Sequence, residues 1–133
     1  MLTAPRAMIN ALFVQPGYET AKKMMDVTAL RHEAIASNLS NLETPNYKRI
    51  DLAPNFETQF KQALTSGDTS QLLSLTPSLA VDTNAVSQNH DGNTVTLEDE
   101  LLAMNQNTLA HALETQLITG DMLKLRMAIT GHA

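Results

Sequence analysis

The sequence has no cysteine and no tryptophan, and aromatic residues make up only 4% of its 133 residues. The absence of cysteine excludes disulfides, thiolate zinc sites and cysteine nucleophiles. Large aromatic rings usually dominate a compact core, so this core has to be built from Leu, Met, Ile, Val and Ala. Such a core favours helices packed on helices over a β-sandwich or a β-barrel.

Basic residues and long apolar runs are also scarce. Nine Lys and Arg are scattered along the chain against 14 Asp and Glu, which gives a net charge of −5. Nucleic-acid-binding proteins normally concentrate basic residues on one face, so no nucleic-acid partner is expected. No apolar run reaches the length of a membrane span. The stretch Ala7–Val14 is short and interrupted by Asn10, and it is expected to form a short helix rather than a secretory signal.

The residue patterns that would indicate catalysis or metal binding are missing too. The four histidines form no HExxH or HxxxH pair, and there is no Gly-rich phosphate loop, GxSxG elbow or dinucleotide-binding fingerprint. The acidic run Glu98–Glu100 is explained by the positive end of a helix dipole without a bound cation. The sequence therefore predicts a protein that is not an enzyme, with no catalytic, cofactor-binding or metal site and no small-molecule substrate.

What the chain does contain is a long helical pattern near each end. The first helix is predicted over 18–43. It follows an N-terminal short helix and a break over 1–17, where Pro16–Gly17 interrupts the chain. The second helix is predicted over 96–131, with negative charge in its first turn, and Gly120 is expected to kink or split it. The predicted fold class is therefore mainly α.

The middle of the chain is predicted to be less regular. A turn and a short helix are expected over 44–65, and the turn contains Asn46, whose place directly after a proline allows a positive φ. The short helix is expected to start at Phe56 with Asn55 as its cap. The loop-rich segment 66–95 is expected to hold at most a short strand or hairpin.

Two features of the long helices raise the question of partners. The C-terminal helix is apolar on two neighbouring faces, and no third long helix is predicted to cover the second face, so a partner is expected. Asn38 and Asn41 lie one turn apart beside Leu39 and Leu42, although asparagine is a poor helix-interior residue. Two interpretations are open: both amides are solvated near a fraying helix end, or they lie in a packed seam where a buried amide fixes the register.

The residues AIASNLSNLETPNYKR (34–49) resemble the N-terminal signature of the bacterial flagellar rod and hook proteins. Ser37 and Asn46 depart from the family pattern, which has Asn and Gly there. The chain is short, and its DGNTV lead-in to the final helix (91–95) resembles a short proximal-rod member of the family. The alternatives are another flagellar rod subunit (FlgC-like), whose likeness to the lead-in is weaker, and, from a different class, a non-flagellar helical adaptor or chaperone.

The resemblance implies a structural subunit of the proximal rod, which transmits torque from the membrane ring to the distal rod and hook. It implies a single rod-type domain over 1–133 whose terminal helices pair as a coiled-coil-like hairpin. The implied partners are further copies of the chain, other rod subunits (FlgC-like and distal), the adaptor protein FliE, the MS ring and the export gate. The resemblance also implies export by the flagellar type III apparatus without a cleaved signal peptide, and a place in the rod that spans the periplasm.

Two groups of residues carry these expectations. The signature and turn consist of Ala36, Asn38, Leu39, Asn41, Thr44, Pro45, Tyr47 and Lys48, which match the family pattern, together with Asn46. The residues expected to pack between subunits are Met24, Ile35, Leu39, Leu42, Leu101, Met104, Leu113, Leu117, Ile118 and Leu125.

Overall fold

The computed structural model describes residues 16–131, so most of the N-terminal short helix predicted over 1–17 lies outside the described residues. The elements and their bounds, in chain order, are α2 Pro16–Ser40, β1 Ile50–Leu52, α3 Pro54–Ser66, α4 Thr69–Ser74, β2 Leu79–Val81 and α5 Leu97–Thr130. None of the described helices is long and apolar enough to span a membrane.

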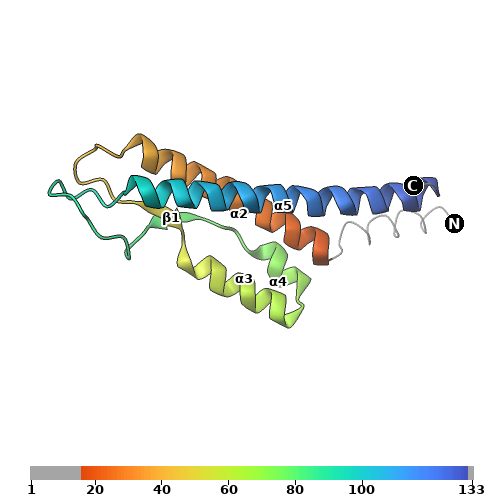
Figure 1. The fold of residues 1–133 in the computed structure, drawn as a ribbon. Helices are drawn as coiled ribbons and strands as arrows, with labels where there is room; N and C mark the ends of the chain where they lie inside the picture. The colour runs from red at the N-terminus through yellow and green to blue at the C-terminus, as the bar shows by residue number, and fades with distance from the viewer. Residues whose placement is uncertain (1–15, 132–133) are drawn as a thin grey trace.

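Helices α2 and α5 lie side by side and run in opposite directions as a long hairpin (Figure 1). The predicted mainly α fold and the pairing of the terminal helices are thereby confirmed. Helix α5 has three acidic residues in its first turn, where the helix dipole favours negative charge. It ends at Gly131, whose left-handed φ of 68° lets its N–H donate to the Met127 carbonyl (2.8 Å).

Of the two predicted interruptions of the long helices, the one at Gly120 is wrong, and the one at Pro16–Gly17 stays a prediction. Pro16 and Gly17 both belong to α2. The residues before Pro16 lie outside the described part of the chain, so the start of this helix is not assigned a cap. Gly120 does not split α5, which runs from Leu97 to Thr130 without a visible kink (Figure 1). One internal glycine costs a helix only about 1 kcal/mol relative to alanine, and the interactions of 34 helical residues outweigh this.

A small lobe formed by α3 and α4 packs against the hairpin through α4 (Figure 1). The rings of Phe56 and Phe60 are stacked, with 5.6 Å between their centroids. Lys23 on α2 donates from Nζ to the Leu75 carbonyl (2.6 Å), which joins the lobe to α2. The core of the lobe consists of Leu52, Phe56, Ala63, Leu72 and Leu75, with Val27 of α2 and Phe60 packed against it.

The segment 66–95 is more regular than predicted. Helix α4 lies in it, where only a strand or hairpin was expected, because six residues are too few to show a helical period. Asp68 caps α4 by accepting from the N–H groups of Ser70 (3.0 Å) and Gln71 (3.2 Å). Strand β2 also lies in this segment and pairs antiparallel with β1, which lies outside it, with Ile50 opposite Val81.

Helix α3 starts two residues earlier than predicted. Its first residue is Pro54, and Ala53 before it makes no side-chain cap, so the expectation that Asn55 caps this helix is wrong. A proline in the first turn needs no partner for its missing N–H. At the other end, Gly67 takes the left-handed conformation that commonly terminates a helix.

Candidate functional site

The two motifs that resemble the flagellar family meet at one end of the hairpin. We call this end, formed by loop 41–49 and segment 91–96, the closed end. The N–H of Thr94 donates to the Tyr47 carbonyl (3.1 Å). The N–H of Arg49 in turn donates to Oγ1 of Thr94 (2.8 Å). Residues far apart in the sequence are therefore joined here by backbone hydrogen bonds.

Asn46 and Gly92 approach each other within the closed end. Both have left-handed backbones, with φ of 60° and 78°, so the positive φ predicted for Asn46 is confirmed. The N–H of Asn46 donates to the Asp91 carbonyl (2.9 Å). A Cβ atom on Gly92 would lie 2.6 Å from Oδ1 of Asn46. Position 92 therefore favours glycine because of its φ, and a Cβ there would also force the end of the Asn46 side chain to move.

Asn93 caps the C-terminal end of α2 from the opposite segment. Its side chain is 1% exposed. Its Nδ2 lies within hydrogen-bond distance of the carbonyls of Asn41 (2.8 Å), Leu42 (3.0 Å) and Thr44 (2.9 Å). Its Oδ1 accepts from the N–H of Val95 (2.8 Å). The last carbonyls of a helix lack partners within the helix, so this amide satisfies the backbone where α2 ends. In the sequence, Asn93 was recognised only as part of the DGNTV lead-in to the final helix.

Asn38 and Asn41 lie in different environments. Asn38 is fully buried, with Oδ1 accepting from the Ile50 N–H (3.0 Å) and Nδ2 donating to the Ile50 carbonyl (2.8 Å). Its Nδ2 also lies 3.2 Å from Oε2 of Glu100. Asn41 is half-buried, and its Oδ1 accepts from the neighbouring Thr44 hydroxyl (3.1 Å). The packed-seam interpretation therefore fits Asn38, and its side chain joins α2 to both β1 and α5.

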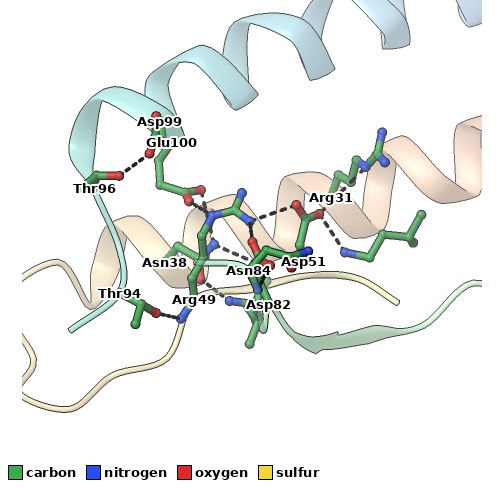
Figure 2. A network of polar contacts seen from close by, with 12 residues as sticks. Arg31, Asn38, Arg49, Asp51, Asp82, Asn84, Thr94, Thr96, Asp99 and Glu100 are labelled. Atoms are coloured by element: carbon green, nitrogen blue, oxygen red, sulfur yellow. Dashed lines mark hydrogen bonds and ion pairs between the residues drawn. The ribbon is translucent and has the colours of Figure 1, made fainter. Parts of the chain in front are cut away.

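Arg49 and Glu100 form the centre of a charged network at the closed end (Figure 2). Glu100 is 0% exposed, and its carboxylate pairs with Nε of Arg49. Nη1 of Arg49 also contacts Asp51 (3.0 Å) and Asp82 (2.8 Å). Burial by itself lowers the pKa of Arg49, but hydrogen bonds with Glu100 and Asp51 outweigh it and raise this pKa above its ordinary value. Sequence reasoning assigned Glu100 to the helix dipole alone, whereas the carboxylate also ties α5 to the two-stranded sheet.

Further along the hairpin, two polar residues of α5 face Thr28 of α2. Nδ2 of Asn107 donates to the Thr28 carbonyl (2.9 Å), and Oγ1 of Thr28 donates to Oε2 of Glu114 (2.9 Å). Burial raises the pKa of Glu114 above its ordinary value, and the Thr28 hydrogen bond offsets part of this effect. Sequence reasoning missed both residues. The sequence signal for both residues was their spacing of seven from Glu100, in a stretch (101–120) where Glu114 is the only Asp, Glu, Lys or Arg.

The face of α5 turned away from α2 carries exposed leucines. We call Leu102, Leu109, Leu113, Leu117 and Leu123 the outer leucine face. Their exposed fractions run from 49% for Leu117 to 74% for Leu109. Large exposed apolar patches on soluble proteins usually mark interaction sites.

The residues predicted to pack between subunits divide by exposure. Ile35 is 5% exposed and lies inside the hairpin, so it contributes to the fold of the subunit itself. The exposed residues are Leu101, Leu113 and Leu117, and the half-buried ones are Met24, Leu39, Leu42, Met104, Ile118 and Leu125.

Across residues 16–131, no group of three or more His, Asp or Glu is placed to hold a metal ion.

No protein-family model matches the chain, but curated proteins resemble it along most of its length. The flagellar basal body rod protein FlgB of Aquifex aeolicus (strain VF5) is 31% identical over 119 residues, which cover 88% of this chain and 95% of that protein. The protein of the same name from Borrelia hermsii is 28% identical over 117 residues, covering 74% and 84%. That of Borreliella burgdorferi is 26% identical over 111 residues, covering 70% and 80%.

The paired terminal helices, the exposed leucines and these relatives together define a structural protein of the bacterial flagellum. The chain belongs to the FlgB family of flagellar basal body rod proteins. The resemblance that rested on the two motifs of the closed end is thereby confirmed. The relatives favour it over an adaptor or chaperone outside the flagellum.

Proposed function

We propose that this chain is a structural subunit of the proximal rod and transmits torque from the membrane ring towards the distal rod and hook. Membership of the FlgB family supports a place in the flagellar rod. The division of the hairpin into a polar seam and an apolar outer face supports assembly through helix packing. The residues described at the closed end serve, in this proposal, to hold the subunit rigid.

The observation that carries the proposal is the outer leucine face. It extends from Leu102 to Leu123, which is roughly 30 Å along a helix at 1.5 Å per residue. Burying one leucine side chain contributes about 1.5–3 kcal/mol, so covering several of them stabilises a polymer contact strongly. The neighbouring helix that covers this face belongs, in the proposal, to another rod subunit.

Torque transmission requires that a load on one helix reaches the other without sliding. Hydrogen bonds and ion pairs are directional and hold one register, whereas apolar contacts alone permit slippage. Asn38 and Glu100 connect α2 to α5 near the closed end, and Thr28 and Glu114 connect them 10 and 14 residues further along. These two connections suit a subunit that passes a twisting load between its helices.

The individual partner proteins are proposed from the family resemblance. We propose contacts with further copies of the chain, with other rod subunits of the FlgC-like and distal kinds, and with the adaptor protein FliE, the MS ring and the export gate. We also propose that the chain is exported by the flagellar type III apparatus without a cleaved signal peptide.

The test is to place a charge on the outer leucine face. Leu113→Asp and Leu117→Asp each put a carboxylate into the proposed subunit contact, where an unpaired charge costs several kcal/mol. We expect rods and motility to be lost in a complemented strain while secretion stays normal. The matched control is Thr108→Asp, which adds the same charge at an exposed polar position of α5 outside the outer leucine face.

Three measurements are needed for each variant: secretion, basal bodies with complete rods, and swimming. Normal rods in both leucine variants would show that this face is not the subunit contact. Equal loss in Thr108→Asp would show that added charge on α5 is harmful outside the outer leucine face too, and that result would also reject the assignment to the leucines.

A further inference from the structure

Helix α5 carries a line of polar residues on the face that packs against α2. Glu100, Asn107 and Glu114 follow one another at intervals of seven and are 0%, 7% and 3% exposed. Asp121, the next position in the series, has a side chain that is 29% exposed. We call the first three the polar line. In a two-helix seam these inward positions are normally apolar, whereas in this hairpin the leucines lie outside.

Each member of the polar line bonds to a specific group, although Oδ1 of Asn107 is buried without a partner among the described residues. Glu100 pairs with Arg49 and lies 3.2 Å from Nδ2 of Asn38. Asn107 and Glu114 both bond to Thr28, one to its carbonyl and one to its hydroxyl. A buried polar group without a partner destabilises a protein. The polar line therefore packs well only against the part of the chain that supplies these partners.

Apolar burial on its own would favour another arrangement. If α5 turned about its axis, the outer leucine face would pack against α2 and the polar line would return to water. Packing the outer leucine face against α2 would remove its apolar area from solvent. Returning the polar line to water would remove the cost of burying its polar groups. The observed hairpin does the opposite, so apolar burial alone does not account for the face of α5 that turns inward.

We propose that the polar line determines the rotational setting of α5 and thereby keeps the outer leucine face free for the neighbouring subunit. The role assigned to the leucines rests on the proposed function, but the setting itself is a property of the single chain. Buried polar groups that select one arrangement at some expense of stability are known from helical assemblies.

Replacing the polar line by leucine should raise the stability of the single chain and reduce its assembly into rods. In the double variant Asn107→Leu/Glu114→Leu, the inward face becomes apolar and the constraint on rotation is weakened. We expect the purified chain to unfold at a higher temperature, while rod formation and motility in complemented cells fall. Residues that merely support the fold would give the reverse, a lower unfolding temperature together with the loss of assembly.

The rotational setting of α5 can be measured with a single introduced cysteine, because the sequence contains no other cysteine that would react. A single reporter, Leu113→Cys, stands at a position that is 58% exposed and should react quickly with a maleimide in the otherwise native chain. In the double-variant background we expect its labelling to slow several-fold, since α5 can now turn its leucine face inward. The control background is Gln116→Leu, which adds a leucine at an exposed position of α5 and leaves the polar line intact.

The outcomes separate the alternatives. Unchanged labelling in the double variant, with helicity retained by circular dichroism, overturns the proposal. Slowed labelling in the Gln116→Leu background also overturns it, because added hydrophobicity alone would then turn the helix. If the double variant does not fold, Asn107→Leu alone is measured in the same way and judged by the same labelling criterion. Normal rods in both Leu113→Asp and Leu117→Asp would reject the outer leucine face as the subunit contact, and the labelling of the monomer would still decide the rotational setting.

Discussion

Three asparagines each place a side-chain amide against the backbone of a distant segment. Nδ2 of Asn38 donates to the carbonyl of Ile50, that of Asn93 to Asn41, and that of Asn107 to Thr28. An amide donates and accepts without a charge, so it can satisfy buried backbone groups at a smaller desolvation cost than an ion. Replacing Asn38 or Asn93 by leucine would remove these bonds from buried backbone groups, at about 1–3 kcal/mol for each group left unpaired. This explains why a residue with poor helix propensity occurs inside two long helices.

Glu114 should make the stability of the folded subunit depend on pH. Its folded-state pKa is raised from 4.5, because burial opposes the charge more than Thr28, His111 and Arg31 favour it. A raised pKa in an acid means that the folded state prefers the protonated form. The stability linked to this proton is fully present below the unfolded pKa and is lost as pH rises through the folded pKa. Glu114→Gln removes the titration, so the variant should gain stability relative to the native chain as pH rises from about 4 to about 7.5.

The measurement is urea unfolding of both proteins across this pH range. Glu98→Gln is the matched control, because Glu98 is exposed in the first turn of the same helix. A difference between Glu114→Gln and the native chain that stays constant with pH would show that Glu114 does not titrate differently on folding.

At the scale of elements, helix α5 and the closed end have different structural roles. The closed end joins loop 41–49 to segment 91–96 through backbone bonds and the capping amide of Asn93. This arrangement fixes where α2 stops and how the chain enters α5. Helix α5 then presents its polar line to α2 and its leucines to the outside. A change in the loop therefore acts on the subunit fold, whereas a change on the outer face acts on assembly.

The close approach of Gly92 to Asn46 predicts an energetic coupling between these two positions. Gly92→Ala should destabilise the fold, because its Cβ would lie 2.6 Å from the Asn46 side chain and its φ of 78° disfavours alanine. Asn46→Gly should be nearly neutral, since glycine accepts the same φ of 60°. In the double variant the clash is removed and only the backbone strain remains, so Gly92→Ala should cost less there.

A double-mutant cycle of unfolding free energies measures this coupling. Strictly additive effects would mean that the clash is relieved by movement of the loop. Asn46→Val serves as the contrasting variant, because a β-branched residue resists positive φ and should destabilise the closed end even with Gly92 intact.

At the scale of the whole molecule, hydrogen bonds connect α2 and α5 both at the closed end and further along the hairpin. Asn38, Glu100 and Arg49 connect the elements there, and Thr28 bonds to Asn107 and Glu114 further along. All side chains from Arg126 to Thr130 are exposed. Isolated helical segments without tertiary cover are marginal in water, so the two ends of α5 should differ in local stability.

Hydrogen exchange of the purified monomer should show this gradient. Amides of α5 after Asp121 are expected to exchange faster than those between Glu100 and Glu114, because local opening there breaks fewer buried contacts. Assembled rods should protect the same amides, since neighbouring subunits then cover the outer leucine face. Uniform protection along α5 in the dilute monomer would contradict this expectation.

Much of this protein is determined by local sequence. Apolar spacing predicts both long helices, and the Thr-Pro-Asn-Tyr turn predicts the left-handed Asn46, because these depend on neighbours a few residues away. The excess of apolar positions on the C-terminal helix is also readable from the sequence, and so is the family resemblance of residues 34–49. The identities of the signature residues were predicted, but their tasks were not: Asn38 is a buried connector, whereas Asn41 bonds locally.

Tertiary structure alone decided which face of α5 turns inward. Helical periodicity places residues around the axis of one helix but does not select the face that meets another segment. That selection depends on pairs such as Thr28 with Glu114 and Asn38 with Glu100, which are 86 and 62 residues apart in the chain. The same holds for Asn93, which caps a helix end 52 residues earlier. A polar side chain shows no local sign of its partner, because the free energy of its burial is set by the groups that folding brings to it.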